Sequence, residues 1–328
     1  MAQPPGIHAR RAALRLLDAV LRRGETLDVA FGAATSDIRK FEDKALARAI
    51  ASETLRWAID FDALIDSATR QNLPDDAKAR QVLRMMLAQW LRLGTPPHAV
   101  IATGLPLLSG GPRRLAHGVF STLTKREAKL PEAPTLPDTV AARWGERAQA
   151  IAAGLAEPPP LDLTLRDSGQ TEHFKTQLAA DSLMPGHLRL PRGAAVETLP
   201  GFEDGAWWVQ DLAASLPARL LGAGEGRTAL DLCAAPGGKT LQLAAQGWKV
   251  TALDISKRRL DLLKANLKRT GLSAGTIRAD ALKWEPKHRY DAILIDAPCT
   301  ATGTARRHPD VLHRIGPRQI EELTELQT

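Results

Sequence analysis

Residues 229–240 read ALDLCAAPGGKT, an apolar segment with the pattern of a strand that runs into two glycines, a lysine and a threonine. From about residue 226 onward, the strand-like segments TALDLC, KVTALD, GTIRAD and DAILIDAP alternate with the helical segments KTLQLAAQ and SKRRLDLLKANLKRTG. Alternation of this kind predicts a parallel, doubly wound sheet of the Rossmann-like α/β class. Because ligands of such sheets bind at the carboxyl ends of the strands, candidate functional residues are sought there.

The end of this stretch, Gly238-Lys239-Thr240, has the form of the second half of a phosphate-binding P-loop. The first glycine of that pattern would stand where this chain has Cys233. Pro236 also lacks the backbone N–H group that a phosphate cradle uses. A second glycine-rich stretch, GAGEG at 222–226, precedes the first strand, whereas a dinucleotide fingerprint follows it. A P-loop NTPase is therefore the less favoured alternative.

Acidic residues end the next three strand-like segments: Asp254 ends KVTALD, Asp280 ends GTIRAD and Asp296 ends DAILID. A single aspartate in such a place is more often a helix cap or a turn former. An acid about 20 residues past the glycine loop suits hydrogen bonds to ribose hydroxyls, and the next one suits an adenine amino group. Three acids after successive strands therefore predict an S-adenosylmethionine site.

The chain has two cysteines, which are too few for a disulfide framework and favour a reduced, cytoplasmic setting. Cys299 lies in DAPCTATGTARRHPDVL, at the end of a strand where a substrate would enter. We interpret its thiol as a reactive group that takes part in the chemistry, in preference to a small buried residue. Cys233 follows a core strand, which favours packing or a backbone contact to the cofactor. The adjacent Arg306-Arg307-His308 either holds a phosphate or forms a solvated face.

The N-terminal part differs from the rest in charge and in pattern. Residues 1–130 contain 20 basic and 13 acidic residues, whereas the rest of the chain is neutral, and residues 81–130 hold 7 basic residues against 1 acidic. Segments such as ARRAALRLLDAVLRR (9–23) repeat apolar residues with helical spacing, and no strand pattern interrupts them up to residue 129. A basic helical bundle beside a neutral domain favours binding of nucleic acid, although solvated arginine-rich helix faces are an equal alternative.

The predicted domains are an all-helical domain at 1–129, a linker and helix at 130–160, a small α/β lead-in subdomain at 161–222, and the Rossmann-like domain at 223–328. The proline-rich LPEAPTLPD (130–138) marks the linker. No apolar run is long enough to span a membrane, and the N-terminus lacks a secretory signal. We expect no metal site, no membrane association and a monomer.

DLCAAPGGKT, together with DAPCTATGT and RHPDVL, resembles the Sun (Fmu-type) family of RNA (cytosine-5) methyltransferases. The helical N-terminal part is similar to the NusB-like RNA-binding domain of the bacterial 16S ribosomal RNA branch of that family. EPPPLDLTLR and GAWWVQDLAASLPARLL look like the family's lead-in to the catalytic domain. The resemblance covers the chain from about residue 8 to its end, and it implies a class I methyltransferase domain that is incomplete at its C-terminus.

The resemblance also implies roles for individual residues. The loop would wrap around S-adenosylmethionine. Asp254 would bind the ribose hydroxyls and Asp280 would contact the adenine. Asp296 would lie near the amino group of the cofactor and the target base. The loop residues are Cys233, Ala234, Ala235, Pro236, Gly237, Gly238 and Lys239. In the family a cysteine thiolate adds to carbon 6 of cytosine, which makes carbon 5 nucleophilic. The Pro-Cys cysteine, here Cys299, is associated with product release.

The family's attacking cysteine lies in a Thr-Cys motif beyond the Pro-Cys, and no Thr-Cys follows Cys299 here. We therefore expect a truncated fragment of a longer enzyme, with the apolar AILID segment at an unpaired sheet edge. If the fragment were active, Cys299 would be the nucleophile, as in DNA cytosine-5 methyltransferases. The remaining alternative is a non-catalytic RNA-binding protein that uses the helical domain. Ribosomal RNA is the implied partner, with transfer RNA also open.

Overall fold

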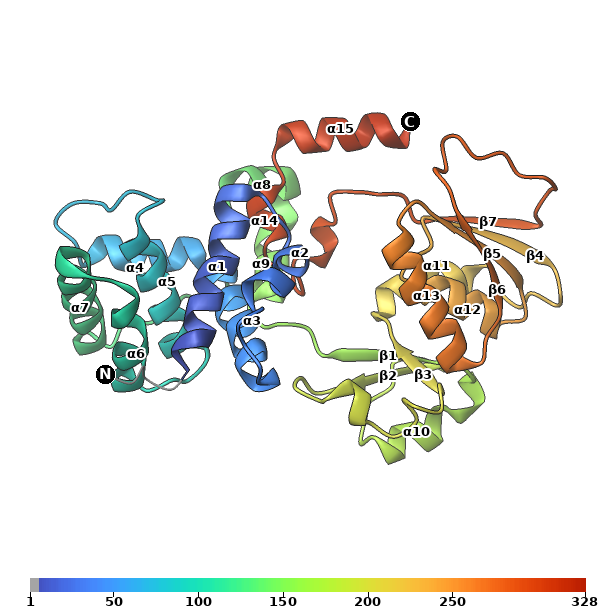
Figure 1. Cartoon of the computed structure of the whole chain (residues 1–328), viewed down its shortest axis with the longest axis horizontal. Coiled ribbons are helices and arrows are strands. Elements are labelled where there is room, and N and C mark those ends of the chain that lie inside the picture. The colour runs from blue at the N-terminus through green and yellow to red at the C-terminus, as the bar shows by residue number, and fades with distance from the viewer. Residues whose placement is uncertain (1–5) are drawn as a thin grey trace. The chain divides into compact units, whose positions relative to one another are not determined.

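The computed structural model describes residues 6–328 and divides them into two compact units (Figure 1). The helical unit contains the chain up to Pro158 and a second segment, Thr300–Leu326. The sheet unit contains Pro159–Cys299. The predicted helical domain starts at residue 1, and its first five residues lie outside the described part of the chain.

The helical unit consists of helices throughout, as the apolar spacing predicts. Its first segment holds α1 (Ile7–Arg23), α2 (Leu27–Ala34), α3 (Phe41–Arg56), α4 (Ala58–Ser67), α5 (Lys78–Leu87), the π-helical η1 (Ala88–Arg92), α6 (Pro97–Gly104), η2 (Leu105–Leu107), α7 (Gly110–Lys125), α8 (Asp138–Trp144), η3 (Gly145–Arg147) and α9 (Ala148–Leu155). Its second segment holds η6 (Thr302–Thr304), α14 (Val311–Arg314) and α15 (Pro317–Gln327).

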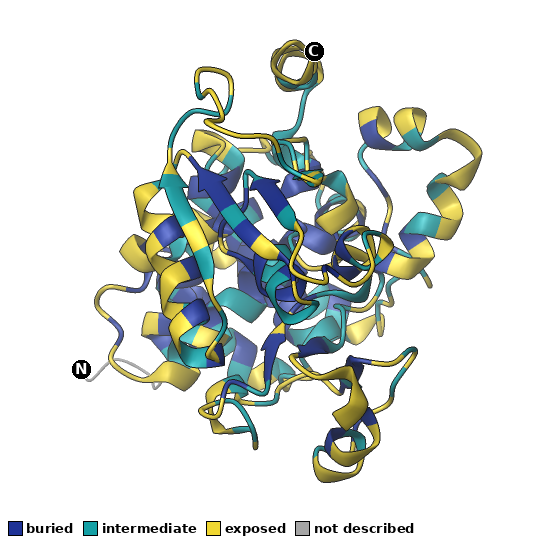
Figure 2. Cartoon of the chain, turned by 90° about the vertical axis from the view of Figure 1, so that its right-hand side faces the viewer, coloured by how far each residue is buried: buried dark blue, intermediate teal, exposed yellow. Residues whose placement is uncertain are grey.

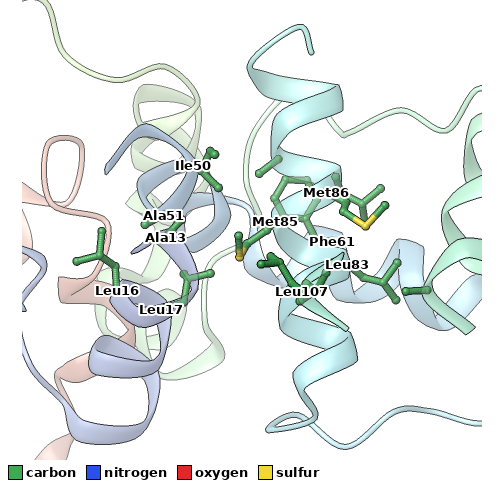
Figure 3. Close-up of a cluster of buried hydrophobic side chains, with 14 of the residues drawn as sticks. Ala13, Leu16, Leu17, Ile50, Ala51, Phe61, Leu83, Met85, Met86 and Leu107 are labelled. Carbon is green, nitrogen blue, oxygen red and sulfur yellow. The ribbon is translucent and has the colours of Figure 1, made fainter. Parts of the chain in front are cut away.

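The core of the helical unit is formed by the apolar stripes of α1, α3, α4 and α5 (Figure 3). Leu17 of α1, Ile50 of α3, Phe61 of α4 and Leu83 of α5 are all fully buried. Burial of such side chains stabilises each by roughly 1.5–3 kcal/mol relative to exposure. Gly24 ends α1 in a left-handed conformation, with φ of 68°, and confirms the predicted stop.

Two helices that the sequence predicts as continuous are broken in the structure. The predicted run at 43–66 is two helices, because Trp57 leaves the helical conformation with φ of −113° and ψ of 20°. The predicted helix at about 140–157 is interrupted at Gly145, which has φ of 53°. Apolar periodicity continues through both breaks, so it does not reveal them.

The sheet unit begins with a small antiparallel sheet in the order β2-β1-β3. Its strands are β1 (Leu161–Leu165), β2 (His187–Leu190) and β3 (Trp207–Val209), with η4 (Ser168–Gln170), α10 (Thr171–Gln177) and η5 (Val196–Thr198) between them. β1, α10 and β2 confirm the predicted elements of the lead-in subdomain. β3 was not predicted, because its three residues show no alternation to detect.

The main sheet is parallel, with the order β6-β5-β4-β7 (Figure 1). Its elements are α11 (Leu212–Leu220), β4 (Thr228–Leu232), α12 (Gly238–Ala245), β5 (Lys249–Asp254), α13 (Lys257–Thr270), β6 (Ala274–Arg278) and β7 (Ala292–Ile295). The central strands are the buried ones (Figure 2). The chain continues from β4 to β5 and β6 on one side and places β7 on the other side of β4. The strand order therefore reverses at β4, where doubly wound sheets bind ligands.

Within the described residues β7 pairs with β4 alone. Ile293 and Ile295 of this strand are 56% and 64% exposed. No helix in residues 6–328 is both long and apolar enough to cross a membrane.

Candidate functional site

The loop between β4 and α12 is fastened to the neighbouring strand by its backbone. The Ala234 amide donates to the Leu253 carbonyl at 3.0 Å, and the Ala235 amide donates to Asp254 Oδ2 at 3.1 Å. Cys233 has a positive φ of 60°, and the Ala235–Pro236 peptide bond is cis. These contacts hold the loop against the carboxyl end of β5.

Gly237 occupies the N-cap of α12 with φ of 108°, a conformation that favours glycine. A Cβ atom added here would lie 2.8 Å from Leu263 Cγ. Gly238 then begins α12, whose first backbone N–H groups have no partner within the helix. The two glycines therefore serve a tight strand-to-helix turn.

Asp254 is the last residue of β5 and is 2% exposed. Besides the Ala235 amide, its carboxylate accepts the Ser256 amide at 2.8 Å. The half-exposed Arg259 lies 3.5 Å from Asp254 Oδ2 and also donates to the Ala235 carbonyl. This carboxylate thus joins the glycine loop to the start of α13.

Asp296 and Asp280 lie at the same end of the sheet, after β7 and β6. Lys239 Nζ and Asp296 Oδ2 are 2.5 Å apart, so the loop lysine is paired with a strand-end acid. Asp280 lies two residues after β6 and accepts the Leu282 amide at 3.1 Å. The structure therefore places the three predicted acids at the carboxyl ends of β5, β6 and β7.

Asp231 is a further acid at this site, and the sequence reasoning did not select it. It lies inside β4 with no exposed surface, accepts the Thr240 hydroxyl at 2.6 Å, and leaves Oδ1 without a partner. Burial raises its pKa to about 6, against the lowering effect of the Thr240 hydrogen bond and Lys239. A charged residue within the buried strand sequence ALDLC is the signal that could have found it.

The two cysteines differ in surroundings. Cys233 is half-buried, and burial together with the carboxylates of Asp254 and Asp296 raises the pKa of its thiol. Such a thiol stays protonated and is a poor nucleophile. Cys299 follows β7 in an exposed loop.

Comparison with known proteins places these features in a family. The family described as 16S rRNA methyltransferase RsmB/F matches residues 218–328, and the NusB family matches residues 7–107. Ribosomal RNA small subunit methyltransferase B of Xanthomonas campestris is 31% identical over 98% of this chain and 79% of its own length. The protein of the same name from Xylella fastidiosa is 33% identical with the same coverage. The chain belongs to the RsmB/F family of 16S rRNA methyltransferases.

A solved structure supports the fold of this RsmB/F family member. The crystal structure of PH0851 superposes with a TM-score of 0.70 at 21% sequence identity, and it covers the whole of this chain and 82% of its own. The family matches and this structural similarity together confirm the NusB-like helical domain and the Rossmann-like methyltransferase domain predicted from the sequence, and the P-loop alternative is wrong.

S-adenosylmethionine is the cofactor of RsmB/F methyltransferases, and the residues at the strand ends fit it. The hydrogen-bond acceptors at the strand ends are carboxylates, which suit ribose hydroxyls and an ammonium group. Asp231 Oδ1, which has no hydrogen-bond partner, lies in the strand that leads into the loop. A rim of acids would repel the phosphates of a nucleoside triphosphate. In residues 6–328, no cluster of histidine, cysteine or acidic side chains could hold a metal ion.

Proposed function

We propose that this chain methylates carbon 5 of a cytosine in 16S ribosomal RNA. The observation that carries the proposal is the glycine loop of β4, bonded to Asp254 at the point where the strand order reverses, with the exposed Cys299 following the adjacent strand β7. The similarity to small subunit methyltransferase B over 98% of the chain supports the ribosomal target.

In this proposal the loop Cys233–Lys239 holds S-adenosylmethionine through backbone groups. Asp254 binds the ribose hydroxyls, Asp280 meets the adenine, and Asp296 faces the amino group. When bound, the cofactor supplies an electrophilic methyl group. Asp254 and Asp296 are already bonded to Ala235 and Lys239, so the acceptors are held in place before the cofactor arrives.

Cys299 is proposed as the thiol that acts on the target base: as the nucleophile if this chain methylates RNA by itself, and in product release if a further cysteine attacks the base. The exposure of Cys299 and the raised pKa of Cys233 support this assignment. Thiolate chemistry at cytosine needs an accessible sulfur that ionises, and the raised pKa of the half-buried Cys233 opposes this role for Cys233.

The helical unit is proposed to bind the RNA substrate. Membership of the NusB family over residues 7–107 and the surplus of basic residues in 1–130 support this role. Arg113, Arg114 and Lys125 of α7 are exposed, as phosphate contacts require. We further propose that the protein acts as a monomer in the cytoplasm, which sedimentation and fractionation measurements test.

A non-catalytic RNA-binding protein is the competing function. Binding of RNA by the helical unit alone needs neither the strand-end acids nor an exposed cysteine. The two functions are separated by S-adenosylhomocysteine, because a ligand that binds only the folded state raises its unfolding midpoint. An unchanged midpoint in a folded sample would favour the binding protein.

The target is tested in cells by bisulfite sequencing, which reads methylation at carbon 5 of individual cytosines. Deletion of the gene should abolish protection at a single cytosine of 16S ribosomal RNA, and a gene with Cys233→Ala should restore it. A gene with Cys299→Ala should not restore it, because turnover stops in either role. Unchanged 16S ribosomal RNA with a lost methylcytosine in another RNA would overturn the proposed target.

A further inference from the structure

The chain passes directly from the site into the helical unit after Cys299. Thr300 already belongs to that unit, and the first fully buried residue is Ala305, which packs in an apolar cluster with Leu136 and Leu155. The six residues from Cys299 to Ala305 span at most about 20 Å when extended. The segment Ala305–Ile315, called the docking segment below, therefore fixes one end of a short link whose other end is Cys299.

Asp310 of the docking segment caps a helix of the N-terminal bundle. Its side chain is buried, and Oδ2 accepts the Leu27 amide at 3.3 Å. Leu27 is the first residue of α2, where backbone N–H groups lack partners within the helix and a negative charge is favourable. Arg314 donates to the same oxygen at 3.2 Å and to the Gly24 carbonyl at 3.3 Å. The negative charge of Asp310 is thus stabilised by the Arg314 guanidinium and by the N-terminus of α2.

A second pair of contacts joins the docking segment to the end of α3. His313 Nε2 lies 2.7 Å from the Leu55 carbonyl, so this nitrogen carries the proton and donates it. Arg56, the last residue of α3, donates to the Arg306 carbonyl at 2.8 Å and to the Leu155 carbonyl at 2.7 Å. The docking segment therefore supplies partners to the start of α2 and the end of α3.

These contacts define one position for the docking segment. Apolar residues such as Val311 and Leu312 would bury surface in many arrangements, since apolar contact has no direction. Buried hydrogen bonds to named backbone groups are directional, and a partner left unsatisfied is expensive. A shift of one residue would separate Asp310 from the Leu27 amide and Arg56 from the Arg306 carbonyl.

We propose that the docking segment anchors the chain that follows Cys299 within the helical unit, with Asp310 as the positioning residue. Any effect of this anchor on methylation rests on the proposed role of Cys299. The anchoring itself needs neither cofactor nor RNA.

The anchor is tested by the reactivity of Cys299 in the full chain. In a Cys233→Ser background Cys299 is the only thiol, and its alkylation by iodoacetamide is followed by mass spectrometry. Asp310→Asn keeps the shape of the side chain and removes its charge, and we expect the alkylation rate to rise about threefold or more as the link is released. Hydrogen exchange at Val311 and Leu312 should rise about tenfold.

Asp18→Asn is the matched control, because it removes a partly exposed acid of α1 that pairs only at the surface with Arg22 and Arg23. It should leave both readouts unchanged. If Asp310→Asn unfolds the helical unit, Arg314→Gln removes the cation on Asp310 and the donor to the Gly24 carbonyl, and it should give the same changes in smaller measure. Faster exchange in the docking segment with an unchanged Cys299 rate would overturn the proposal. Both readouts are measured without S-adenosylhomocysteine or RNA. They would therefore give the same result if the proposed methylation were wrong.

Discussion

The backbone amide of Ala235 donates a hydrogen bond to the Asp254 carboxylate, with N and Oδ2 3.1 Å apart. This bond joins the loop after β4 to the end of β5, and it makes Asp254 both a support of the loop and a candidate acceptor for the ribose. A side chain with two such roles should affect stability and cofactor affinity together when it is changed.

Gly237→Ala should weaken both the fold and cofactor binding. The added methyl group meets Leu263 Cγ at 2.8 Å, and φ of 108° is unfavourable for alanine. We expect a loss of at least about 1 kcal/mol in the free energy of unfolding of the sheet unit. Calorimetry measures the loss, and Gly118→Ala is the control, because Gly118 lies in α7 with open space around its Cβ position and should become slightly more stable. Equal effects of the two substitutions would contradict the strained turn.

Asp231→Asn should stabilise the sheet unit at high pH. Burial raises the pKa of Asp231 to about 6, so the folded state favours the protonated carboxyl group, and the stability that this contributes at low pH is lost as the pH rises through about 6. Asparagine removes that loss, and we expect a gain of about 2 kcal/mol at pH 8 and none at pH 4. Affinity for S-adenosylhomocysteine should fall in the same variant.

Asp162→Asn is the matched control with the opposite sign. Burial raises the pKa of Asp162, but hydrogen bonds from Arg189 and the Leu212 amide bring it below its ordinary value. The charged carboxylate therefore stabilises the fold above its ordinary pKa, and the asparagine variant should be less stable than the parent at pH 8. A gain in stability in both variants would contradict these assignments.

RNA binding should depend on salt through the basic face of α7. Replacement of the exposed Arg113 and Arg114 by glutamine should weaken RNA binding and reduce the slope of log affinity against log salt by about 1 for each RNA phosphate that is no longer neutralised. Filter binding at several salt concentrations measures the slope. Glutamine at the partly exposed Lys175 and the exposed Arg192 of the lead-in subdomain is the control with the same change of charge. An equal slope in both double variants would remove α7 from the RNA interface.

The docking segment should loosen as the pH falls. Burial lowers the pKa of His313, with Arg84 acting in the same direction and the Leu55 carbonyl, Asp310 and Asp62 acting against it, and burial also lowers the pKa of His308. Both rings are therefore neutral when docked, whereas the undocked rings take up protons below their ordinary pKa of about 6.5. Docking is fully stable above this pH and weakens below it.

Hydrogen exchange of Val311 and Leu312 at pH 7.5 and pH 5.5, corrected for the intrinsic exchange rate, measures this change. His313→Gln keeps a side-chain N–H donor for Leu55 without the titration, so its protection should vary less with pH than that of the parent. Identical pH dependence in the two proteins would show that His313 does not control docking.

The sequence predicted the repeated features of the structure and missed those that depend on distant contacts. The alternation of strand-like and helical segments predicted the parallel sheet, and the acids that end the strand-like segments predicted Asp254, Asp280 and Asp296 as site residues. Both features are local patterns in the sequence. Asp231 was missed because its burial comes from neighbouring strands. The docking segment lies within the predicted methyltransferase domain and within the family match at 218–328. Its packing in the helical unit could not be predicted from the sequence, since Asp310 meets Leu27 across 283 residues.

Binding of S-adenosylhomocysteine to the full chain tests the central claim most directly. Calorimetric titration should give one site in the parent protein, an affinity at least about tenfold weaker in Asp254→Asn, and no binding of ATP. Asp291→Asn is the matched control, because Asp291 accepts the Thr228 amide and hydroxyl, both at 2.8 Å, beside the start of β4 at the opposite end of the sheet. It should keep the parent's affinity. A folded parent protein that binds ATP and fails to bind S-adenosylhomocysteine would contradict the account.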